Sequence, residues 1–224
     1  LRAVSHDLRT PLTSIYGACS AMRDNYDALP RQTHMKLLSD VCADAQWLVR
    51  MVENLLSVTR VDAATVRLSK NGTVLEELID AVLVKFRKHY PDIDVHVEIP
   101  EEVVSIPMDA MLISQVLMNL LENAVFHAKG MENLRLRVEV KGSWAYFYVE
   151  DDGCGIPEEK LSRLFTGMLD SEAPTDQSRS SMGIGLSVCS AIIKAHGGEI
   201  WANKRAGGGT EVGFRLEMED ENGE

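Results

Sequence analysis

The chain lacks an excess of positive charge and lacks any long apolar run. Its 23 Lys and Arg stand against 34 Asp and Glu, which gives a formal net charge of −11. A bulk electrostatic grip on nucleic acid or on anionic lipid is therefore not expected. No uninterrupted apolar run approaches the roughly 18 residues that a membrane-spanning helix needs. The start of the chain also has no signal-peptide pattern.

The cysteines give no indication of a metal site or a disulfide framework. No C-x-x-C pair and no His at a zinc-finger interval occur among Cys19, Cys42, Cys154 and Cys189. Scattered free thiols are typical of a reducing compartment, and buried structural cysteines are the expectation. The first residue is Leu1 rather than Met. We therefore expect a cytoplasmic fragment of a longer protein, with any membrane anchor in segments upstream.

Glycine is nearly missing from the first sixty residues, where Gly17 is the only one. Two apolar periodicities with alternating steps of three and four fill this region, which is typical of heptad seams on helices. A turn at 27–30 separates them, so residues 1–62 are predicted to form an antiparallel helical hairpin. Such a hairpin is expected to pair with a second copy in a homodimeric four-helix bundle, because two helices alone bury little. The seam residues are Leu1, Val4, Leu8, Pro11, Ile15, Ala18 and Met22, then Leu38, Val41, Ala45, Leu48, Val52, Leu55 and Thr59.

A His–Asp pair lies in the first predicted helix, and its His is on the face that points away from the apolar seam. With Leu1 at heptad position a, His6 falls at position f and is predicted to point into solvent. An exposed helix histidine is most often a plain surface residue, but Asp7 follows it and Thr10 lies one turn later. Pro11 costs about 3 kcal/mol inside a helix and is predicted to kink it, which suggests strain tolerated for function. A carboxylate beside an imidazole can take one ring proton and leave the other nitrogen nucleophilic.

The run Ser5-His6-Asp7-Leu8-Arg9-Thr10-Pro11-Leu12 resembles the H-box of sensor histidine kinases, the two-component signalling enzymes. The resemblance implies that His6 is the phospho-acceptor and that Asp7 is its general acid/base. It also implies that Thr10 helps to position water when the kinase runs backwards as a phosphatase on its partner.

After Asp62 the pattern changes to strand-like alternation mixed with helical runs. This mixture predicts an α+β sandwich over 63–219, with helices on one face of a mixed sheet, followed by an acidic tail at 220–224. The expected strands are 94–99, 134–140, 144–149, 199–202 and 211–216, and the expected helices are 74–88, 109–128 and 185–196.

Two motifs in this second part place polar groups among apolar or glycine residues. Asn119 and Asn123 lie one turn apart on an apolar helix face. They are either polar residues of a packed helix or amide carbonyls directed at Mg²⁺. Asp151 follows a strand directly, and Gly153 and Gly155 after it let the backbone approach a flat ligand. Taken alone, that second motif is more often a plain turn.

A third motif, Gly183-Ile184-Gly185-Leu186, precedes the helical run that starts at Ser187. A glycine-rich helix start presents free N–H groups to phosphate, although G-x-G alone is a weak signal. In this order and at these intervals, the three motifs resemble the N, G1 and G2 boxes of the same kinases, which share an ATP fold with gyrase and heat-shock chaperone ATPases. Leu164-Phe165 resembles the F-box, and residues 207–210 resemble the last glycine motif.

The resemblance covers about residues 1–218 and implies bound ATP and Mg²⁺. It implies Asn123 as the principal Mg²⁺ ligand with Asn119 nearby. It implies Asp151 on the adenine amino group, assisted by Thr210 through water, and a lid over ATP at 157–182. The other nucleotide-binding residues that it implies are His127, Gly153, Gly155, Arg179, Gly183, Gly185 and Leu186.

Some positions depart from the family pattern. The hydrolytic relatives carry a Glu where Asn119 stands, and Glu122 has the wrong spacing to replace it, so transfer to a protein nucleophile is favoured over hydrolysis. Phe126-His127 replaces the usual Lys-Tyr, and Arg179 or Lys129 can supply the missing charge. The F-box lacks its basic residues at 166–168, and Ser181 replaces the first lid glycine.

Two functions remain open on the sequence. The first is an ATP-dependent protein-histidine kinase that phosphorylates His6 and passes the phosphate to a response-regulator aspartate, with phosphatase activity as well. The second is a dimerisation and docking module with a weakened ATP site, which acts mainly as a regulator-binding protein or phosphatase. The phrases at 119–125 and 195–200 resemble the potassium-sensing Kdp-type branch, which implies a membrane-anchored bacterial parent.

Overall fold

The computed structural model describes residues 2–62, 68–161, 164–165 and 182–218. The chain divides into two compact units, Leu1–Leu56 and Ser57–Glu224. The helices within the described ranges include none that is both long and apolar enough to cross a membrane. Residues 166–181, which hold most of the expected lid, lie outside the described part, as does the expected tail at 220–224.

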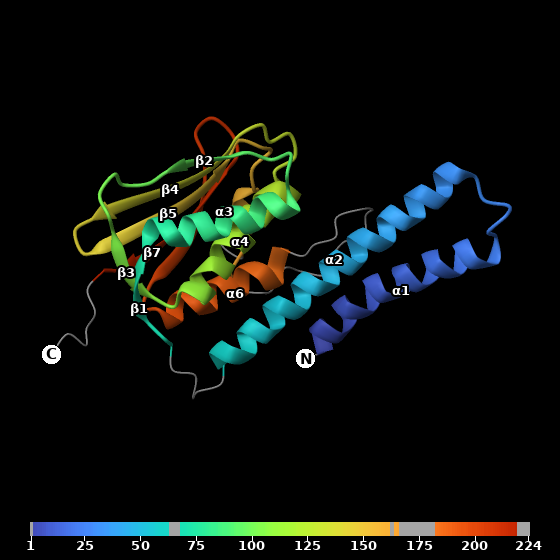
Figure 1. Cartoon of the computed structure of the whole chain (residues 1–224), viewed down its shortest axis with the longest axis horizontal. Helices are drawn as coiled ribbons and strands as arrows, with labels where there is room; N and C mark the ends of the chain where they lie inside the picture. The colour runs from blue at the N-terminus through green and yellow to red at the C-terminus, as the bar shows by residue number, and fades with distance from the viewer. Residues whose placement is uncertain (1, 63–67, 162–163, 166–181, 219–224) are drawn as a thin grey trace. The chain divides into compact units, whose positions relative to one another are not determined.

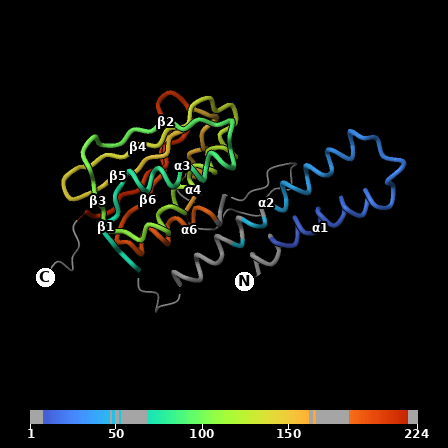
Figure 2. The backbone as a smooth tube through the Cα atoms, in the orientation of Figure 1, coloured from blue at the N-terminus to red at the C-terminus, as the bar shows by residue number. Residues whose placement is uncertain are grey.

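The first unit contains the helical hairpin that the sequence predicts, apart from the last residues of its second helix. Helix α1 is Arg2–Asp24 and helix α2 is Arg31–Asp62, joined by a short turn (Figures 1 and 2). Helix α1 continues through Pro11, whose side chain is buried. Two residues further along, the Thr13 hydroxyl donates to the Arg9 carbonyl at 2.9 Å. Pro11, where the sequence predicts a kink, therefore lies inside the helix that carries the His–Asp pair and does not end it.

The heptad seam is only partly confirmed. In α1 the seam residues Leu8, Pro11 and Ile15 are buried or half-buried, as expected. In α2 the seam residues Leu38 and Val52 are each 47% exposed. The alternating steps of three and four predicted the two helices correctly. They also predicted that Leu38 and Val52 face a partner helix, but within a single hairpin these two side chains remain exposed.

The second unit is built on a five-stranded mixed sheet in the order β2-β4-β5-β7-β6. Strand β2 runs parallel to β4, and the other neighbours are antiparallel. Strands β1 and β3 form a separate antiparallel pair that the sequence did not predict, because each has only four residues. The strands are β1 Asn71–Val74, β2 Val95–Glu98, β3 Ser105–Met108, β4 Leu134–Lys141, β5 Trp144–Asp151, β6 Glu199–Lys204 and β7 Thr210–Glu217.

Helices α3 (Leu75–His89), α4 (Ala110–His127) and α6 (Met182–Ala195) lie on one face of this sheet (Figure 1). The expected α+β sandwich is therefore confirmed. Their apolar sides pack on the sheet, where Phe147 and Phe214 stack with ring centroids 4.6 Å apart. The short helix α5 (Glu158–Leu161) was also not expected.

The start of α6 corrects the sequence prediction. The helix begins at Met182 rather than at 185–187, so Gly183 and Gly185 lie in its first turn instead of before it. Glycine has a low helix propensity, which is why the pattern alone placed the boundary later. The start of helix α4 was predicted to within one residue. Its N-cap residue Asp109 accepts hydrogen bonds from the N–H groups of Met111 and Leu112 at 3.2 Å each.

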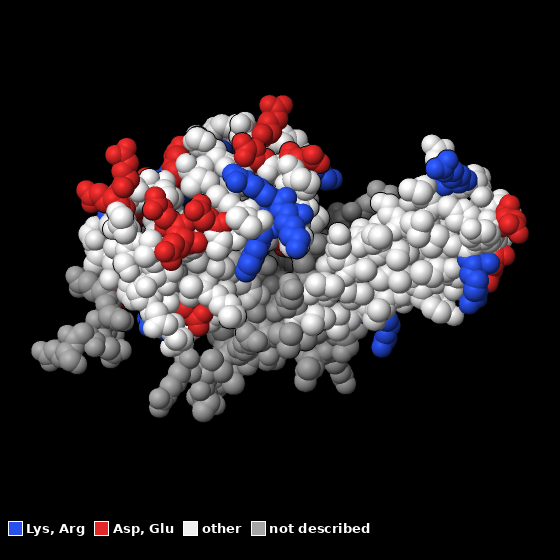
Figure 3. Space-filling model, in the orientation of Figure 1, with Lys and Arg blue, Asp and Glu red and all other residues white. Residues whose placement is uncertain are grey.

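Charge is distributed unevenly on the face drawn in Figure 3. Acidic side chains spread over the second unit, and basic ones gather mainly in one group. The last turn of α3 carries Arg87, Lys88 and His89, which complement the negative end of the helix dipole. The excess of acidic side chains agrees with the net charge of −11.

Candidate functional site

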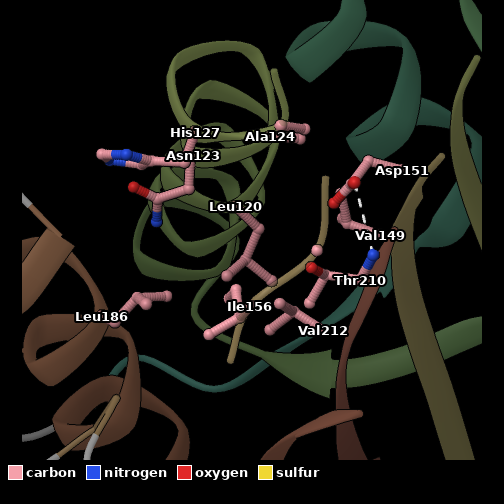
Figure 4. Close-up of a pocket in the computed structure, with 12 residues that line it drawn as sticks. Leu120, Asn123, Ala124, His127, Val149, Asp151, Ile156, Leu186, Thr210 and Val212 are labelled. Carbon is pink, nitrogen blue, oxygen red and sulfur yellow. Dashed lines mark hydrogen bonds between the residues drawn. The ribbon is translucent and has the colours of Figure 1, made fainter. Parts of the chain in front are cut away.

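One pocket in the second unit is lined from four parts of the chain that are distant in sequence (Figure 4). They are the second half of α4, the end of β5 with the loop after it, the first turns of α6, and the start of β7. The lining residues are Leu120, Asn123, Ala124, His127, Ala128, Val149, Asp151, Gly155, Ile156, Leu186, Thr210 and Val212.

The lining is mostly apolar, with polar groups at its ends. Figure 4 shows Asn123 and His127 at one end, Asp151 and Thr210 at the other, and Leu120 among the side chains between them. A mainly apolar cavity with a few convergent polar groups is typical of small-molecule sites. The arrangement suits an elongated ligand with a flat apolar part along the middle of the pocket and polar groups that reach both ends.

Asp151 is held so that one of its oxygens stays available. Its Oδ1 accepts hydrogen bonds from the N–H groups of Gly153 at 3.0 Å and Thr210 at 3.3 Å. Both donors within the described part of the chain use Oδ1, which leaves Oδ2 for a donor on a ligand. The residue is 6% exposed, and burial raises the pKa of its carboxyl group, opposed by these two N–H groups and by the charge of Arg205.

The other end of the pocket holds two buried nitrogens that need a partner. Nδ2 of Asn123 and Nε2 of His127 are inaccessible to solvent and have no hydrogen bond to any described residue. Burial lowers the pKa of the His127 imidazole. A buried polar group without a partner costs about 1–3 kcal/mol, so such pairs are rare unless a ligand satisfies them. The structure therefore supports a polar ligand group at this end.

Glycines bring the loop after β5 against its neighbours. A Cβ on Gly153 would lie 2.6 Å from the Cβ of Ala128, at the end of α4. Gly155 has φ +71°, a conformation that side chains rarely adopt. Gly153 does not line the pocket, but its close approach to Ala128 fixes the wall that Gly155 completes.

Asp152 does not line the pocket, but it is a supporting residue beside it that the sequence reasoning missed. Its Oδ1 accepts from the backbone N–H groups of Glu132 at 2.8 Å and Asn133 at 2.9 Å, and its Oδ2 accepts from Asn133 Nδ2 at 2.6 Å. These bonds lower the pKa of the Asp152 carboxyl group to about 2. Asp152 thus ties the loop after α4 to the loop after β5. The doubled Asp151-Asp152 was the available signal.

Asn119 does not line the pocket. It is half-buried and faces α6, where burial raises the pKa of the Cys189 thiol to about 12 against a hydrogen bond with Asn119. The two asparagines of the motif therefore have different surroundings, although they lie one turn apart. Only Asn123 contributes to the cavity.

Some of the other predicted catalytic and nucleotide-binding residues lie within the described part of the structure, and others lie outside it. His6 and Asp7 lie on α1, with side chains outside the described set, and Thr10 is exposed one turn later. Gly183 lies in the first turn of α6, Gly185 there is buried, and Leu186 lines the pocket. The departures at 166–168 and Ser181, and the expected ligand Arg179, lie outside the described residues.

Two family models match the chain. Residues 108–220 match the model described as histidine kinase-, DNA gyrase B-, and HSP90-like ATPase. Residues 1–64 match the His Kinase A (phospho-acceptor) domain. The chain therefore belongs to this ATPase family, and with its phospho-acceptor domain it belongs to the sensor histidine kinases, a class of protein-histidine kinases.

Relatives of known name are sensor proteins. The chain is 34% identical over 220 residues to the sensor protein KdpD of Clostridium acetobutylicum, covering 98% of this chain and 24% of that protein. It is 32% identical over 213 residues to KdpD of Escherichia coli, covering 93% and 23%. It is 30% identical over 216 residues to SrrB of Staphylococcus aureus, covering 95% and 36%. The chain thus spans about a quarter to a third of the length of these relatives.

Solved structures share the fold. Histidine kinase ThkA in complex with response regulator protein TrrA matches with a TM-score of 0.75 and 25% identity, covering 99% of this chain and 61% of that one. Acinetobacter baumannii histidine kinase AdeS matches with a TM-score of 0.69 and 24% identity, covering 96% and 98%. The expected combination of a helical hairpin and an ATPase-type sandwich is confirmed.

Proposed function

We propose that the chain is the transmitter part of a sensor kinase, which phosphorylates its own His6 from ATP and passes the phosphate to an aspartate of a response regulator. The observation that carries the proposal is the pocket. It combines a buried carboxylate, Asp151, at one end with the unpartnered Asn123 and His127 nitrogens at the other. The family model over 108–220 supports ATP as the ligand.

The pocket suggests how a nucleotide lies in it. The adenine amino group donates to Oδ2 of Asp151, with Thr210 beside it, and the base packs on Leu120. The phosphates then lie toward Asn123 and His127, whose buried nitrogens gain an acceptor. The amide carbonyl of Asn123 is a suitable ligand for Mg²⁺, a hard cation that accepts neutral oxygens when phosphates supply the charge. Bound Mg²⁺ supplies charge neutralisation to the triphosphate.

The proposed reaction exchanges one bond at phosphorus for another. The unprotonated ring nitrogen of His6 forms a P–N bond to the γ-phosphorus, while the bond to the bridging oxygen breaks and ADP leaves with that electron pair. Asp7 accepts the proton from the other ring nitrogen. In the second step a regulator carboxylate oxygen forms a P–O bond as the P–N bond breaks. The His6 imidazole leaves with that electron pair and takes its proton back from Asp7. In the reverse mode, Thr10 on the exposed side of α1 positions water for phosphatase activity.

The lining of the pocket supports transfer rather than hydrolysis. Asp151 is the only carboxylate among the described lining residues, and its Oδ1 is engaged by two backbone N–H groups. The position that carries a water-activating Glu in hydrolytic relatives is Asn119, which faces α6 instead of the cavity. Without a carboxylate beside the phosphates to take a proton from water, water is a weaker competitor of His6.

The hairpin supports a homodimer. The first unit exposes large apolar side chains along both helices, which a second hairpin would cover in a four-helix bundle. These side chains are Leu12, Tyr16, Met35, Leu38, Val49 and Val52. The ThkA structure, which is a complex with a response regulator, supports a regulator as the second partner. The two KdpD relatives support a Kdp-type, membrane-anchored parent with this part in the cytoplasm.

Incubation with γ-labelled ATP and Mg²⁺ tests the proposal. We expect acid-labile, base-stable label on the wild type, as for a phosphoramidate. His6→Gln should lose the label but still bind nucleotide, and Asn123→Ala should lose both. The matched controls His89→Gln and Asn203→Ala, at exposed positions, should keep both. Label that persists on His6→Gln would show that another residue is the acceptor.

One observation favours the second candidate, a docking module with a weakened ATP site. Phe126 stands where the family has a phosphate-contacting Lys, and its ring meets the edge of Tyr90 with centroids 6.1 Å apart. A thermal shift with Mg-ATP separates the two functions, because a ligand stabilises only a protein that binds it. No shift, together with retained binding of a response regulator, would favour the docking module.

A further inference from the structure

Arg205 follows β6, and its side chain reaches the end of β5, where Asp151 lies. Its Nη1 donates to the backbone carbonyl of Asp151 at 2.8 Å, and its Nη2 lies 3.4 Å from Oε2 of Glu150. Its own N–H donates to the Gly209 carbonyl at 3.2 Å, and its carbonyl accepts from the N–H of Gly208 at 3.2 Å. One residue therefore closes the turn between β6 and β7 and binds that turn to the end of β5.

The Glu150 carboxylate that Arg205 contacts is itself held in position. Successive residues of a strand point to opposite faces, so Glu150 lies on the sheet face away from the pocket while Asp151 lies on the pocket side. The Glu150 side chain is 6% exposed, and Arg137 donates to its Oε1 from Nε at 3.1 Å and Nη2 at 2.9 Å. The planar guanidinium of Arg205 is suited to engage this carboxylate and the neighbouring carbonyl together.

The turn between β6 and β7 also positions the Asp151 carboxylate. Thr210, the residue after the turn, donates from its N–H to Oδ1 of Asp151 at 3.3 Å. Gly209 has φ +85°, and a Cβ there would lie 2.0 Å from the Asp151 carbonyl oxygen. The turn therefore sits against the strand end with no room for a side chain, and the direction of the free Oδ2 depends on where the turn lies.

We propose that Arg205 is the positioning residue for the Asp151 carboxylate and thereby sets the preference for a purine that carries an exocyclic amino group. The inference rests on the proposed function, in which Asp151 Oδ2 accepts from the adenine amino group. Arg205 does not line the pocket and acts through the Asp151 carbonyl and the turn. Without the Arg205 side chain, Glu150 retains its hydrogen bonds from Arg137, so the sheet stays intact. The turn between β6 and β7 then loses the contact that holds it against the end of β5, and the Asp151 carboxylate loses its fixed direction.

The test compares two nucleotides that differ only at the amino group. Binding of Mg-ATP and of purine riboside triphosphate, which lacks that group, is measured by titration calorimetry on the wild type, Arg205→Met and Arg205→Lys. For Arg205→Met we expect about tenfold weaker ATP binding and less than about twofold change for the purine analogue, because a hydrogen bond to a charged group discriminates on this scale. Arg205→Lys should regain part of the ATP affinity.

Arg215→Met is the matched control. Arg215 lies over the Trp144 ring at 4.3 Å and pairs with Glu199 at 2.9 Å, away from the pocket. It should leave both affinities unchanged. Equal weakening of both nucleotides by Arg205→Met would overturn the positioning role in favour of a structural one, as would no change in either. A wild type that binds neither nucleotide would instead overturn the proposed function.

Discussion

The backbone N–H of Asp109 donates a hydrogen bond to Nε2 of His196, at 3.1 Å, across 87 positions of the sequence. The other ring nitrogen, Nδ1, lies 2.8 Å from the carbonyl oxygen of Ile192 and must therefore carry the proton. His196 is 3% exposed, and its own carbonyl accepts from Lys70 Nζ at 3.1 Å. A neutral imidazole of one tautomer thus joins the end of α6 to the N-cap of α4.

The first prediction is that acid weakens the second unit through His196. Burial lowers the pKa of this imidazole, and the nearby Lys70 charge acts in the same direction, against the Ile192 carbonyl and Asp109. The unfolded chain therefore binds a proton at a higher pH than the folded one, so the free energy of unfolding falls as pH drops below about 6.5. Urea unfolding between pH 8 and pH 5 measures this slope.

Two variants separate His196 from the other histidines. His196→Gln keeps an acceptor for the Asp109 N–H but cannot titrate, so it should lower stability near pH 7.5 and reduce the slope below 6.5. Part of the slope should remain, because burial also lowers the pKa of His127. His89→Gln, at an exposed position, should keep the wild-type slope. If His196→Gln and the wild type have parallel pH profiles, His196 does not couple protons to folding.

The second prediction concerns the contact between Gly209 and Asp151. Gly209→Ala should destabilise the second unit by at least about 2 kcal/mol, because the new Cβ meets a backbone oxygen and takes a positive φ. Gly142→Ala has φ +62° but open space around its Cβ, so it should cost only about 1 kcal/mol. Denaturant midpoints compare the two; equal losses would mean that backbone conformation alone accounts for the effect.

The third prediction separates the two asparagines of α4. Asn123→Ala should abolish Mg-dependent nucleotide binding while changing the unfolding free energy little, because it removes a group that lacks a partner within the described structure. Asn119→Ala should instead lower stability, because it removes the hydrogen bond to buried Cys189, and should reduce nucleotide affinity less. Calorimetric titration measures the nucleotide affinity of each variant, and urea unfolding measures its free energy of unfolding. Equal loss of nucleotide affinity in the two variants would place Asn119 in the site.

The fourth prediction concerns the thiols. Cys19, Cys42 and Cys154 are exposed, so the expectation of buried cysteines is wrong for these three, and they should react with a thiol reagent in the folded chain. Cys189 should react only on unfolding, because burial raises its pKa to about 12 and shields it from the reagent. Time-resolved thiol titration with and without urea counts both classes. Fast modification of Cys189 in the native chain would show that α6 opens readily.

Much of the architecture was predictable from local pattern. The alternation of three and four predicted the two helices of the hairpin, and the period of two predicted all five strands of the main sheet, because a buried face imposes these periods on the sequence. The four-residue strands β1 and β3 were missed because so short a segment carries no period. The start of α6 was placed late, because glycine in a first helical turn resembles a loop.

The sequence by itself determined the class of the protein. The H-box around His6, and the order and spacing of the asparagine and glycine motifs, are short linear patterns whose chemistry depends on residue type. Asn123, Asp151 and Thr210 were all predicted as nucleotide-binding residues, and the structure brings them to one pocket. Residue type also excluded a broad basic surface, since the charge balance is a property of composition.

Only the tertiary structure decided which residues hold the site in place. Asp152 and Arg205 gave no decisive sequence signal, because their roles depend on backbone groups that folding brings to them from positions 19 to 54 residues away. The division between Asn119 and Asn123 was likewise invisible in the pattern, since a helix face does not show what packs against it. Sequence fixes the chemical groups that are present, whereas packing fixes the partners that each group finds.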